Sequence, residues 1–270
     1  MKRILALVAA LGMALTAYAD EGMWLLPLLQ KMNGKALKEA GCKLSPDEIY
    51  SINHSSLKDN IIHFGGGCTG EIISADGLIV TNHHCGYSSI QALSTDEHNY
   101  LMDGYWAMTR AEELPANGLS ITFLQSMTDV TDALAKAEKK FAKKNPGQVD
   151  SLMKVERQAI IDKALKDNKN CRAELVNFYN DNVTYLIVSK TYRDVRFVGA
   201  PPVAVGKFGG EADNWEWPRH TGDFSMFRVY AGPDNEPAEY APENKPYRAE
   251  RFLKTSLKGV KEGDYTMILG

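Results

Sequence analysis

Two neighbouring histidines and a cysteine in the stretch TNHHCG, residues 81–86, are the side chains best suited to chemistry. A neutral imidazole can take a proton from a serine hydroxyl, and it can also bind a metal ion together with a cysteine thiolate. The first role needs one histidine with a carboxylate partner, whereas the second needs several ligands that converge on one point. The surroundings of His83, His84 and Cys85 decide between the two roles.

A β-hairpin bracketed by two cysteines is expected directly before the histidines. The segment CTGEIISADGLIVTNHHC holds two apolar or β-branched runs, 69–73 and 78–81, separated by Ser-Ala-Asp-Gly. Asp-Gly between such runs is a strong hairpin signal. A four-residue turn would bring Cys68 and Cys85, 17 residues apart (85 − 68), within reach of a disulfide. Such a loop is worth about 3 kcal/mol in the chain-entropy model. Two buried free thiols are the alternative.

This hairpin resembles the segment of chymotrypsin-like serine peptidases that delivers the general-base histidine directly before the second cysteine of a disulfide. The resemblance implies that His84, which adjoins Cys85, is the base and that His83 is its neighbour. A general base must lie within hydrogen-bond reach of the serine hydroxyl. The disulfide and the strand end would fix the backbone that carries it.

A general base of this type also needs a buried carboxylate that sets its tautomer and stabilises the imidazolium. The candidates are Asp213 and Asp223, in the stretch FGGEADNWEWPRHTGDFSMFRVY, residues 208–230. Asp213 lies in an expected loop and should be exposed. Asp223 directly precedes the apolar strand expected at 224–229, where a carboxylate can be buried and still hydrogen-bonded. Asp223 is therefore the preferred partner.

The motifs TNHHCG and DNWEWPRHTGDFSMFRVY together resemble the bacterial dipeptidyl-peptidase 7 and 11 family, which comprises exported serine exopeptidases of the chymotrypsin clan. The resemblance covers residues 20–270. It implies that His84 is the base and Asp223 its orienting acid. It also implies that Asn214 and Trp215 help to bind the free α-amine of the substrate. The partners it implies are peptides with a free N-terminus and a second copy of the chain, as a homodimer of the full-length protein; no cofactor is expected.

An amine pocket built from Asn214 and Trp215 has a physical rationale. The asparagine carbonyl can accept a hydrogen bond from an ammonium group, and an indole face can add a cation–π contact of about 0.5–2 kcal/mol. The alternative is that Trp215 and Trp217 simply pack under the loop that carries them.

The nucleophilic serine of the resembled family lies far downstream, in a Gly-x-Ser-Gly type of turn that this chain does not contain. Its own serines, among them Ser88 and Ser225, lack the flanking glycines that expose a nucleophile. We therefore expect residues 20–270 to be the N-terminal part of the catalytic domain and to be inactive alone. A non-catalytic chymotrypsin-like peptide-binding module is the alternative.

A metal site and a cysteine peptidase are the competing chemistries. The side chains of residues 83–85 and of His63 could be offered as ligands, but neighbours on a strand point to opposite sides. The sequence also holds no His-Glu-x-x-His and no Cys-x-x-Cys motif. Cys85 is too close to His84 in sequence to be activated by it. We therefore expect no metal.

The elements around these motifs predict a mainly β fold with helical additions. The resemblance implies a chymotrypsin-like β-barrel, the first barrel of a double-barrel peptidase, here incomplete. Helices are expected at 21–40 and from Ser45, with a helical insertion at about 129–180. The remaining expectations are strands at 61–64, 69–73, 78–81, 183–189, 195–198 and 224–230, an exposed connection at 231–250, and a strand-like run at 264–270.

Residues 1–19 have the pattern of a secretory signal peptide. Two basic residues precede a short apolar run at 4–15, and Ala17-Tyr18-Ala19 fits signal-peptidase cleavage before Asp20. A membrane anchor is the weaker alternative, because the run is shorter than the roughly 20 residues that span a bilayer. We expect an exported protein, in the periplasm or at the cell surface of a Gram-negative bacterium, with no membrane span after cleavage.

Export would place the cysteines in an oxidising compartment, where disulfides persist. Cys42 and Cys171 could pair with each other, or either could stay free. The net charge of −3 is that of an ordinary globular protein and argues against nucleic acid as a partner.

Overall fold

The structure is a computed structural model, and it describes residues 22–213 and 216–270. The expected signal peptide, residues 1–19, and the two expected amine-binding residues, Asn214 and Trp215, lie outside the described residues. Within the described part, no helix is both long and apolar enough to cross a membrane.

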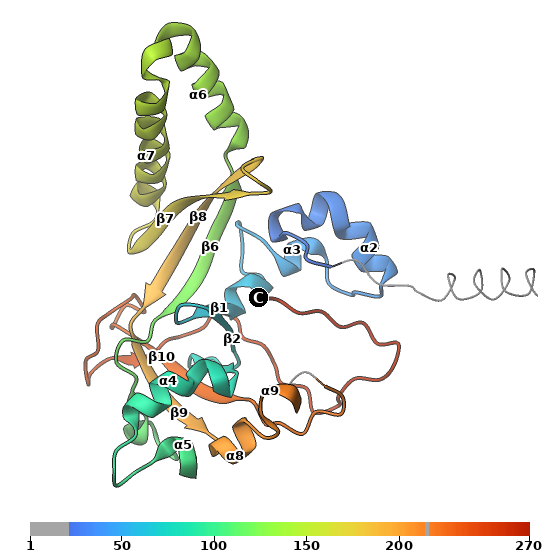
Figure 1. The fold of residues 1–270 in the computed structure, drawn as a ribbon, viewed down its shortest axis with the longest axis vertical. Coiled ribbons are helices and arrows are strands. Elements are labelled where there is room, and N and C mark those ends of the chain that lie inside the picture. Colours follow the sequence, from blue (N-terminus) through green and yellow to red (C-terminus); the bar gives the residue numbers. More distant parts are fainter. Residues whose placement is uncertain (1–21, 214–215) are drawn as a thin grey trace, which may run out of the picture.

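One antiparallel sheet dominates the described part of the chain, in the hydrogen-bonded order β4-β9-β10-β3-β2-β1-β6-β8-β7, with β11 added to β10 and β5 to β9 (Figure 1). The strands are β1 Ile61–Phe64, β2 Cys68–Ile72, β3 Leu78–Thr81, β4 Tyr105–Trp106, β5 Leu114–Pro115, β6 Ile121–Asp129, β7 Cys171–Phe178, β8 Val183–Tyr192, β9 Asp194–Ala200, β10 Ser225–Ala231 and β11 Lys245–Pro246.

A single extended segment, residues 183–200, makes this sheet curl. Strands β8 and β9 are separated only by Arg193; β8 pairs with β6, whereas β9 pairs with β10. Strands β6 and β10 lie on opposite sides of β1–β3 in the sheet, so one segment holds both flanks. The sheet is not closed, since its path ends at β4 and β7. The expected mainly β fold with helical additions, as an incomplete barrel, is confirmed.

The concave face of the curled sheet carries the main hydrophobic core. Side chains alternate between buried and accessible along β1, where Ile62 and Phe64 point inward. The ring of Phe227 on β10 lies 5.0 Å from Phe64 and 5.3 Å from Phe197, measured between centroids. Each fully buried side chain of this size stabilises the fold by about 1.5–3 kcal/mol. The strands that carry the motifs are therefore held by packing against one another.

Helices lie at the ends and on one side of the sheet. They are α2 Gly34–Glu39, α3 Pro46–Ile49, α4 His83–Leu93, α5 Tyr100–Asp103, α6 Thr131–Lys144, α7 Val149–Asp167, α8 Val203–Gly206 and α9 Gly210–Asp213; short 3₁₀ turns cover 26–28, 57–60, 110–112 and 146–148, and a π-turn covers 29–33. The expected continuous helix at 21–40 is wrong, because it breaks into a 3₁₀ turn, a π-turn and α2. The helix start at Ser45 is confirmed by a capping box with Glu48.

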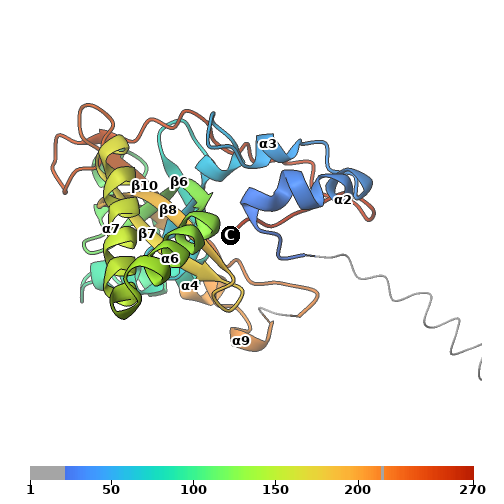
Figure 2. The ribbon, with the colours of Figure 1, turned by 90° about the horizontal axis from the view of Figure 1, so that it is seen from above.

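The helical insertion is shorter than expected. Helices α6 and α7 form a hairpin that projects along the long axis of the molecule (Figure 1) and lies over β7 and β8 when seen from above (Figure 2). They end at Asp167, whereas the expectation extended to about 180. Residues 171–178 instead form β7 and pair with β8 along their whole length, because the edge of β8 is available to them.

The apolar run at 264–270 is not a strand, in contrast to the expectation. Its side chains Tyr265 and Leu269 pack against a second small core that includes Leu37 and Cys42. Two of its apolar side chains therefore contact the N-terminal helices, whereas Met267 and Ile268 are exposed. Cys42 and Cys171 are both free thiols.

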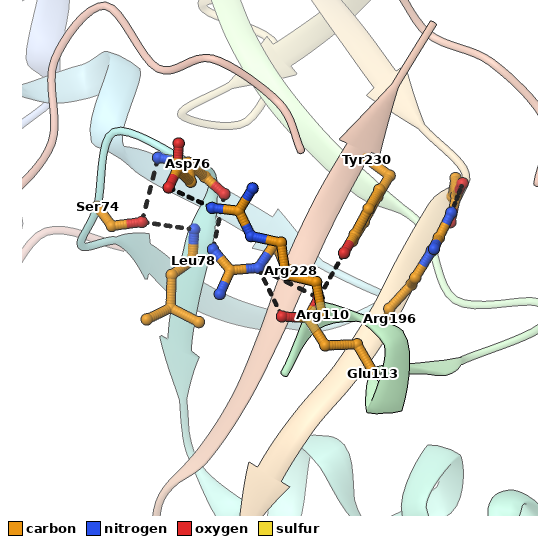
Figure 3. A network of polar contacts seen from close by, with 9 residues as sticks. Ser74, Asp76, Leu78, Arg110, Glu113, Arg196, Arg228 and Tyr230 are labelled. Carbon is orange, nitrogen blue, oxygen red and sulfur yellow. Dashed lines mark hydrogen bonds and ion pairs between the residues drawn. The ribbon is translucent and has the colours of Figure 1, made fainter. Parts of the chain in front are cut away.

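A buried polar network ties β10 to the β2–β3 turn (Figure 3). The carboxylate of Glu113 accepts hydrogen bonds from Arg228 Nε at 2.9 and 3.2 Å and from the Tyr230 hydroxyl at 2.8 Å. Arg228 Nη1 also donates to the Asp76 carbonyl at 2.9 Å. Burial and the bond to Glu113 raise the pKa of Tyr230 to about 12. The guanidinium of Arg196 lies 3.6 Å from the centre of the Tyr230 ring.

This network predicts that Glu113→Gln destabilises the fold. The substitution leaves the guanidinium of Arg228, whose side chain is mostly buried, without its charged partner. Removal of one member of a buried ion pair costs about 3–5 kcal/mol. Urea unfolding should show a loss of this size, whereas Glu138→Gln, at an exposed site on α6, should change the free energy of unfolding by less than about 0.5 kcal/mol. Equal effects of the two substitutions would contradict a stabilising role of the Glu113–Arg228 ion pair.

Candidate active site

His84 is the second residue of helix α4, three residues after β3 ends at Thr81. The sequence-based picture of two histidines on a strand is therefore wrong. On a helix, successive side chains diverge by about 100°. The side chain of His84 is 53% exposed, whereas His83 is fully buried. The two rings therefore face different surroundings, and only His84 is open to a substrate.

Asp223 meets the ring of His84. Its Oδ2 lies 2.8 Å from His84 Nδ1, and its Oδ1 accepts the backbone N–H of His84 at 3.1 Å. The Asp223 side chain is only 4% exposed. Asp213, the other candidate carboxylate, lies at the end of helix α9, and His84 is bonded to Asp223 instead. The structure thus brings together the preferred pair.

The register between β3 and β10 brings these residues together across 139 positions of sequence. Ser225 pairs with Thr81 at the end of this ladder, so Asp223, before β10, and Asn82, after β3, lie just beyond the paired strands. The Asn82 side chain donates to the Asp223 carbonyl at 3.2 Å and to Oδ2 at 3.3 Å. Ser225 Oγ donates to the Asn82 carbonyl at 2.9 Å. Asn82 is therefore hydrogen-bonded to the β10 segment through both its side chain and its backbone carbonyl.

Asp223 also caps the N-terminus of helix α4. The first turn of a helix has backbone N–H groups without partners inside the helix, and they attract a negative charge. Asn82 occupies the N-cap position but its side chain does not cap the helix. Asp223, two residues before β10, accepts the His84 N–H in its place. One carboxylate thereby fixes both the backbone and the ring of His84.

Asp223 remains ionised because these bonds outweigh its burial. Burial alone raises the pKa of the carboxyl, but the hydrogen bonds from the His84 backbone and ring, and the charge on His84, lower it. The net result is a pKa below the ordinary value of an aspartate. An ionised Asp223 favours the His84 tautomer with its proton on Nδ1, which leaves Nε2 free to accept a proton.

A disulfide anchors the same turn of α4. Cys85 is bonded to Cys68, at the start of β2, with 6.0 Å between the two Cα atoms. The residue that adjoins His84 is thus covalently attached to the neighbouring hairpin. The hairpin turn is closed by Ile73 N–H, which donates to the Leu78 carbonyl at 2.8 Å.

The one cluster of candidate metal ligands among the described residues coincides with this disulfide. Ligand atoms of Cys68, His84 and Cys85 lie within 4.8 Å of one another. Both sulfurs are consumed by the disulfide and cannot act as thiolates. The cluster therefore offers one imidazole to a metal, fewer than a protein zinc site uses.

No serine among the described residues makes a hydrogen bond to His84. Ser225 is buried and bonded to Asn82, and Ser88 is exposed on α4. Asn214 and Trp215 lie outside the described residues, so their expected role stays a prediction. Trp217 is 93% exposed, which is contrary to the alternative that it packs under its loop.

Sequence reasoning missed two features of the site. Asn82 lies inside the quoted motif, yet its bonds to Asp223 depend on a strand pairing that the sequence does not display. The complete burial of His83 was missed as well. The signal for the burial of His83 would have been a helix that begins inside the motif, which the apolar spacing of Tyr87, Ile90 and Leu93 allows.

Several known proteins resemble this chain over nearly its whole length. The family model described as Peptidase S46 matches residues 19–270. A dipeptidyl-peptidase 7 from Phocaeicola vulgatus is 50% identical over 259 residues, which cover 95% of this chain and 36% of the relative. An Asp/Glu-specific dipeptidyl-peptidase from Porphyromonas gingivalis is 47% identical over 272 residues, which cover 99% of this chain and 37% of the relative.

Solved structures show the same relationship. The crystal structure of Porphyromonas endodontalis DPP11 in complex with the dipeptide Arg-Asp superposes with a TM-score of 0.79 at 44% identity, over 91% of this chain and 36% of that one. The chain thus spans a little more than a third of the length of these relatives. The family model covers nearly the whole chain, and the two relatives share about half of its residues. The chain therefore belongs to the peptidase S46 family.

Proposed function

We propose that this chain forms part of a serine-type dipeptidyl peptidase that releases dipeptides from the free N-terminus of peptides. The observation that carries the proposal is the contact of 2.8 Å between His84 Nδ1 and a buried, ionised Asp223. The relatives are named dipeptidyl peptidases, and this supports the same activity for the protein that contains this chain.

In this proposal His84 is the general base. Asp223 holds the proton on Nδ1, so Nε2 takes the proton of a serine hydroxyl as the oxygen attacks the peptide carbonyl. The imidazolium that forms is stabilised by Asp223 and returns the proton to the leaving amine. Water then hydrolyses the acyl-enzyme with His84 again as base. The serine lies outside residues 1–270 in this proposal, and these residues alone are then inactive.

The other parts of the proposal concern the whole protein. Asn214 and Trp215 bind the α-amine of the peptide, which restricts cleavage to the second bond from the N-terminus. The signal-peptide pattern at residues 1–19 supports export to the periplasm or cell surface. The full-length protein is a homodimer in this proposal. Size-exclusion chromatography with light scattering tests the last point directly.

Substitutions of the two proposed triad members should separate their roles in the complete enzyme. His84→Ala should abolish dipeptide release because it removes the base. Asp223→Asn should lower kcat by roughly 10⁴ because an amide favours the wrong tautomer of His84. Both are measured as release of a chromogenic group from a dipeptide substrate. Near-normal turnover by either variant would refute the assignment, and Asp129→Asn, at an exposed site on β6, serves as the control.

The proposed amine site predicts a different kinetic effect. Asn214→Ala should raise KM for a peptide with a free N-terminus and change kcat less, since the side chain binds a group remote from the reacting carbonyl. Acetylation of the substrate amine should remove the difference between the two enzymes. An unchanged KM for the free peptide would count against an amine-binding role.

A further inference from the structure

His83 is a buried histidine that the proposed mechanism does not use. It lies at the first position of α4, next to His84, and it is fully inaccessible to solvent. Neither ring nitrogen makes a hydrogen bond of standard geometry with the described residues, although the Pro201 carbonyl lies close enough to raise the pKa of the ring. Buried polar side chains normally find partners, because desolvation without compensation is costly. A leucine or phenylalanine would fill such a space at lower cost, so the imidazole at this position calls for a reason.

The ring of His83 presses against helix α8. A Cβ atom placed on Gly206 would lie 2.4 Å from both Cγ and Cδ2 of His83. Real Cβ atoms do not approach that closely, so only glycine fits at this position without displacement of the ring. On its other side the ring of Tyr87 lies 6.3 Å away, edge to face. His83 therefore fits tightly between α4 and α8.

Helix α8 in turn contacts the residue that precedes Asp223. The Gly222 N–H donates to the Val205 carbonyl at 3.0 Å. A Cβ atom on Gly222 would lie 2.8 Å from Cγ1 of Val205, so a larger residue there would displace the Val205 side chain. One step further along the loop, Thr221 Oγ1 donates to the Phe208 carbonyl at 2.7 Å. The backbone at Gly222 is thus held against α8.

These contacts close a circuit around the catalytic pair. The circuit runs from His83 to Gly206, through Val205 to Gly222, and along the chain to Asp223. Asp223 bonds to His84, which is covalently joined to His83. Two glycines lie in this circuit, and a Cβ atom on either one would lie 2.4 Å (Gly206) or 2.8 Å (Gly222) from a neighbouring side chain. A displacement of the His83 ring would therefore reach the carboxylate through a path of only two packed contacts.

Burial, more than any neighbouring charge, favours the neutral form of the His83 ring. Burial lowers the pKa of His83, and the positive charges of His84 and Lys207 act in the same direction, while Asp223 and the Pro201 carbonyl oppose them. A neutral His83 adds no second positive charge beside Asp223. The carboxylate then interacts with a single imidazolium, that of His84, when the latter takes up a proton.

We propose that His83 is a positioning residue, which sets the place of Asp223 relative to His84 through its packing on Gly206 and the Val205–Gly222 contact. This inference rests on the proposed peptidase function. A displaced Asp223 should lower kcat, because the position of the carboxylate determines how well His84 is oriented. KM should change less, because the substrate makes no contact with His83. An error of about 1 Å in the position of a catalytic group can cost about 10²-fold in rate.

The test uses Gly206→Ala and Gly222→Ala in the complete enzyme, singly and combined. Neither glycine has a positive φ, so alanine is tolerated by the backbone and the new methyl acts only on the contact. Each substitution should lower kcat at least about 10-fold with KM changed less than about twofold. Each should also shift the acid limb of the pH profile of kcat/KM, because a displaced carboxylate stabilises the His84 imidazolium less. The double variant should lose little more than the worse single one, since both act on the same circuit.

Gly66→Ala is the matched control, because a Cβ atom there has nothing within 4 Å and the site is an exposed turn. His83→Gln is the second variant of the circuit, should an alanine variant fail to fold, and it too should lower kcat. Wild-type kcat and an unchanged pH profile in folded variants, with only a lower Tm, would overturn the inference, as would multiplicative losses in the double variant.

His84→Ala is measured in parallel, so that failure of this inference can be told from failure of the proposed function. If His84→Ala is active, the proposed function itself fails. If it is inactive and the circuit variants are normal, only this inference fails.

Discussion

The carboxylate of Asp223 is the group on which the rest of the site depends. It lies against the N-terminus of α4, where unpaired backbone N–H groups and the helix dipole favour a negative charge. From there it binds both the backbone N–H and the ring of His84. A buried carboxylate would be costly without these donors. The same bonds that lower its pKa orient the imidazole, so one interaction both stabilises the charge and positions the proposed base.

The sheet supports this interaction by joining β3 and β10. The ladder from Arg228–Leu78 to Ser225–Thr81 ends where Asn82 and Asp223 begin, and the disulfide Cys68–Cys85 ties the start of α4 to β2. At the other end of β10 the network around Glu113 holds Arg228 and Tyr230 (Figure 3). Both ends of the strand are thus fixed by polar contacts, and its middle is fixed by Phe227 in the core. Rigid supports of this kind are what a catalytic pair requires.

Much of this arrangement could be predicted because its signals are local. The hairpin with Asp76-Gly77, the flanking cysteines and the capping box at Ser45 each lie within a few residues of one another. The choice of Asp223 over Asp213 rests on the apolar strand that directly follows it, again a local pattern. What failed depends on distant partners. Residues 171–178 become a strand because β8 offers an edge, and residues 264–270 form no strand, with Tyr265 and Leu269 in contact with the N-terminal core instead. The cap of α4 by a carboxylate 139 residues away, and the circuit from His83 to Gly222, cannot be read from sequence spacing at all.

In the proposed function, His84 and Asp223 activate a serine that is not among these 270 residues. The decisive experiment is reaction of the complete enzyme with a serine-directed fluorophosphonate, followed by peptide mapping by mass spectrometry. We expect one modified serine, located C-terminal to Gly270, and no modification in the His84→Ala variant. Modification of a serine within residues 20–270, or equal modification of the His84→Ala variant, would contradict it.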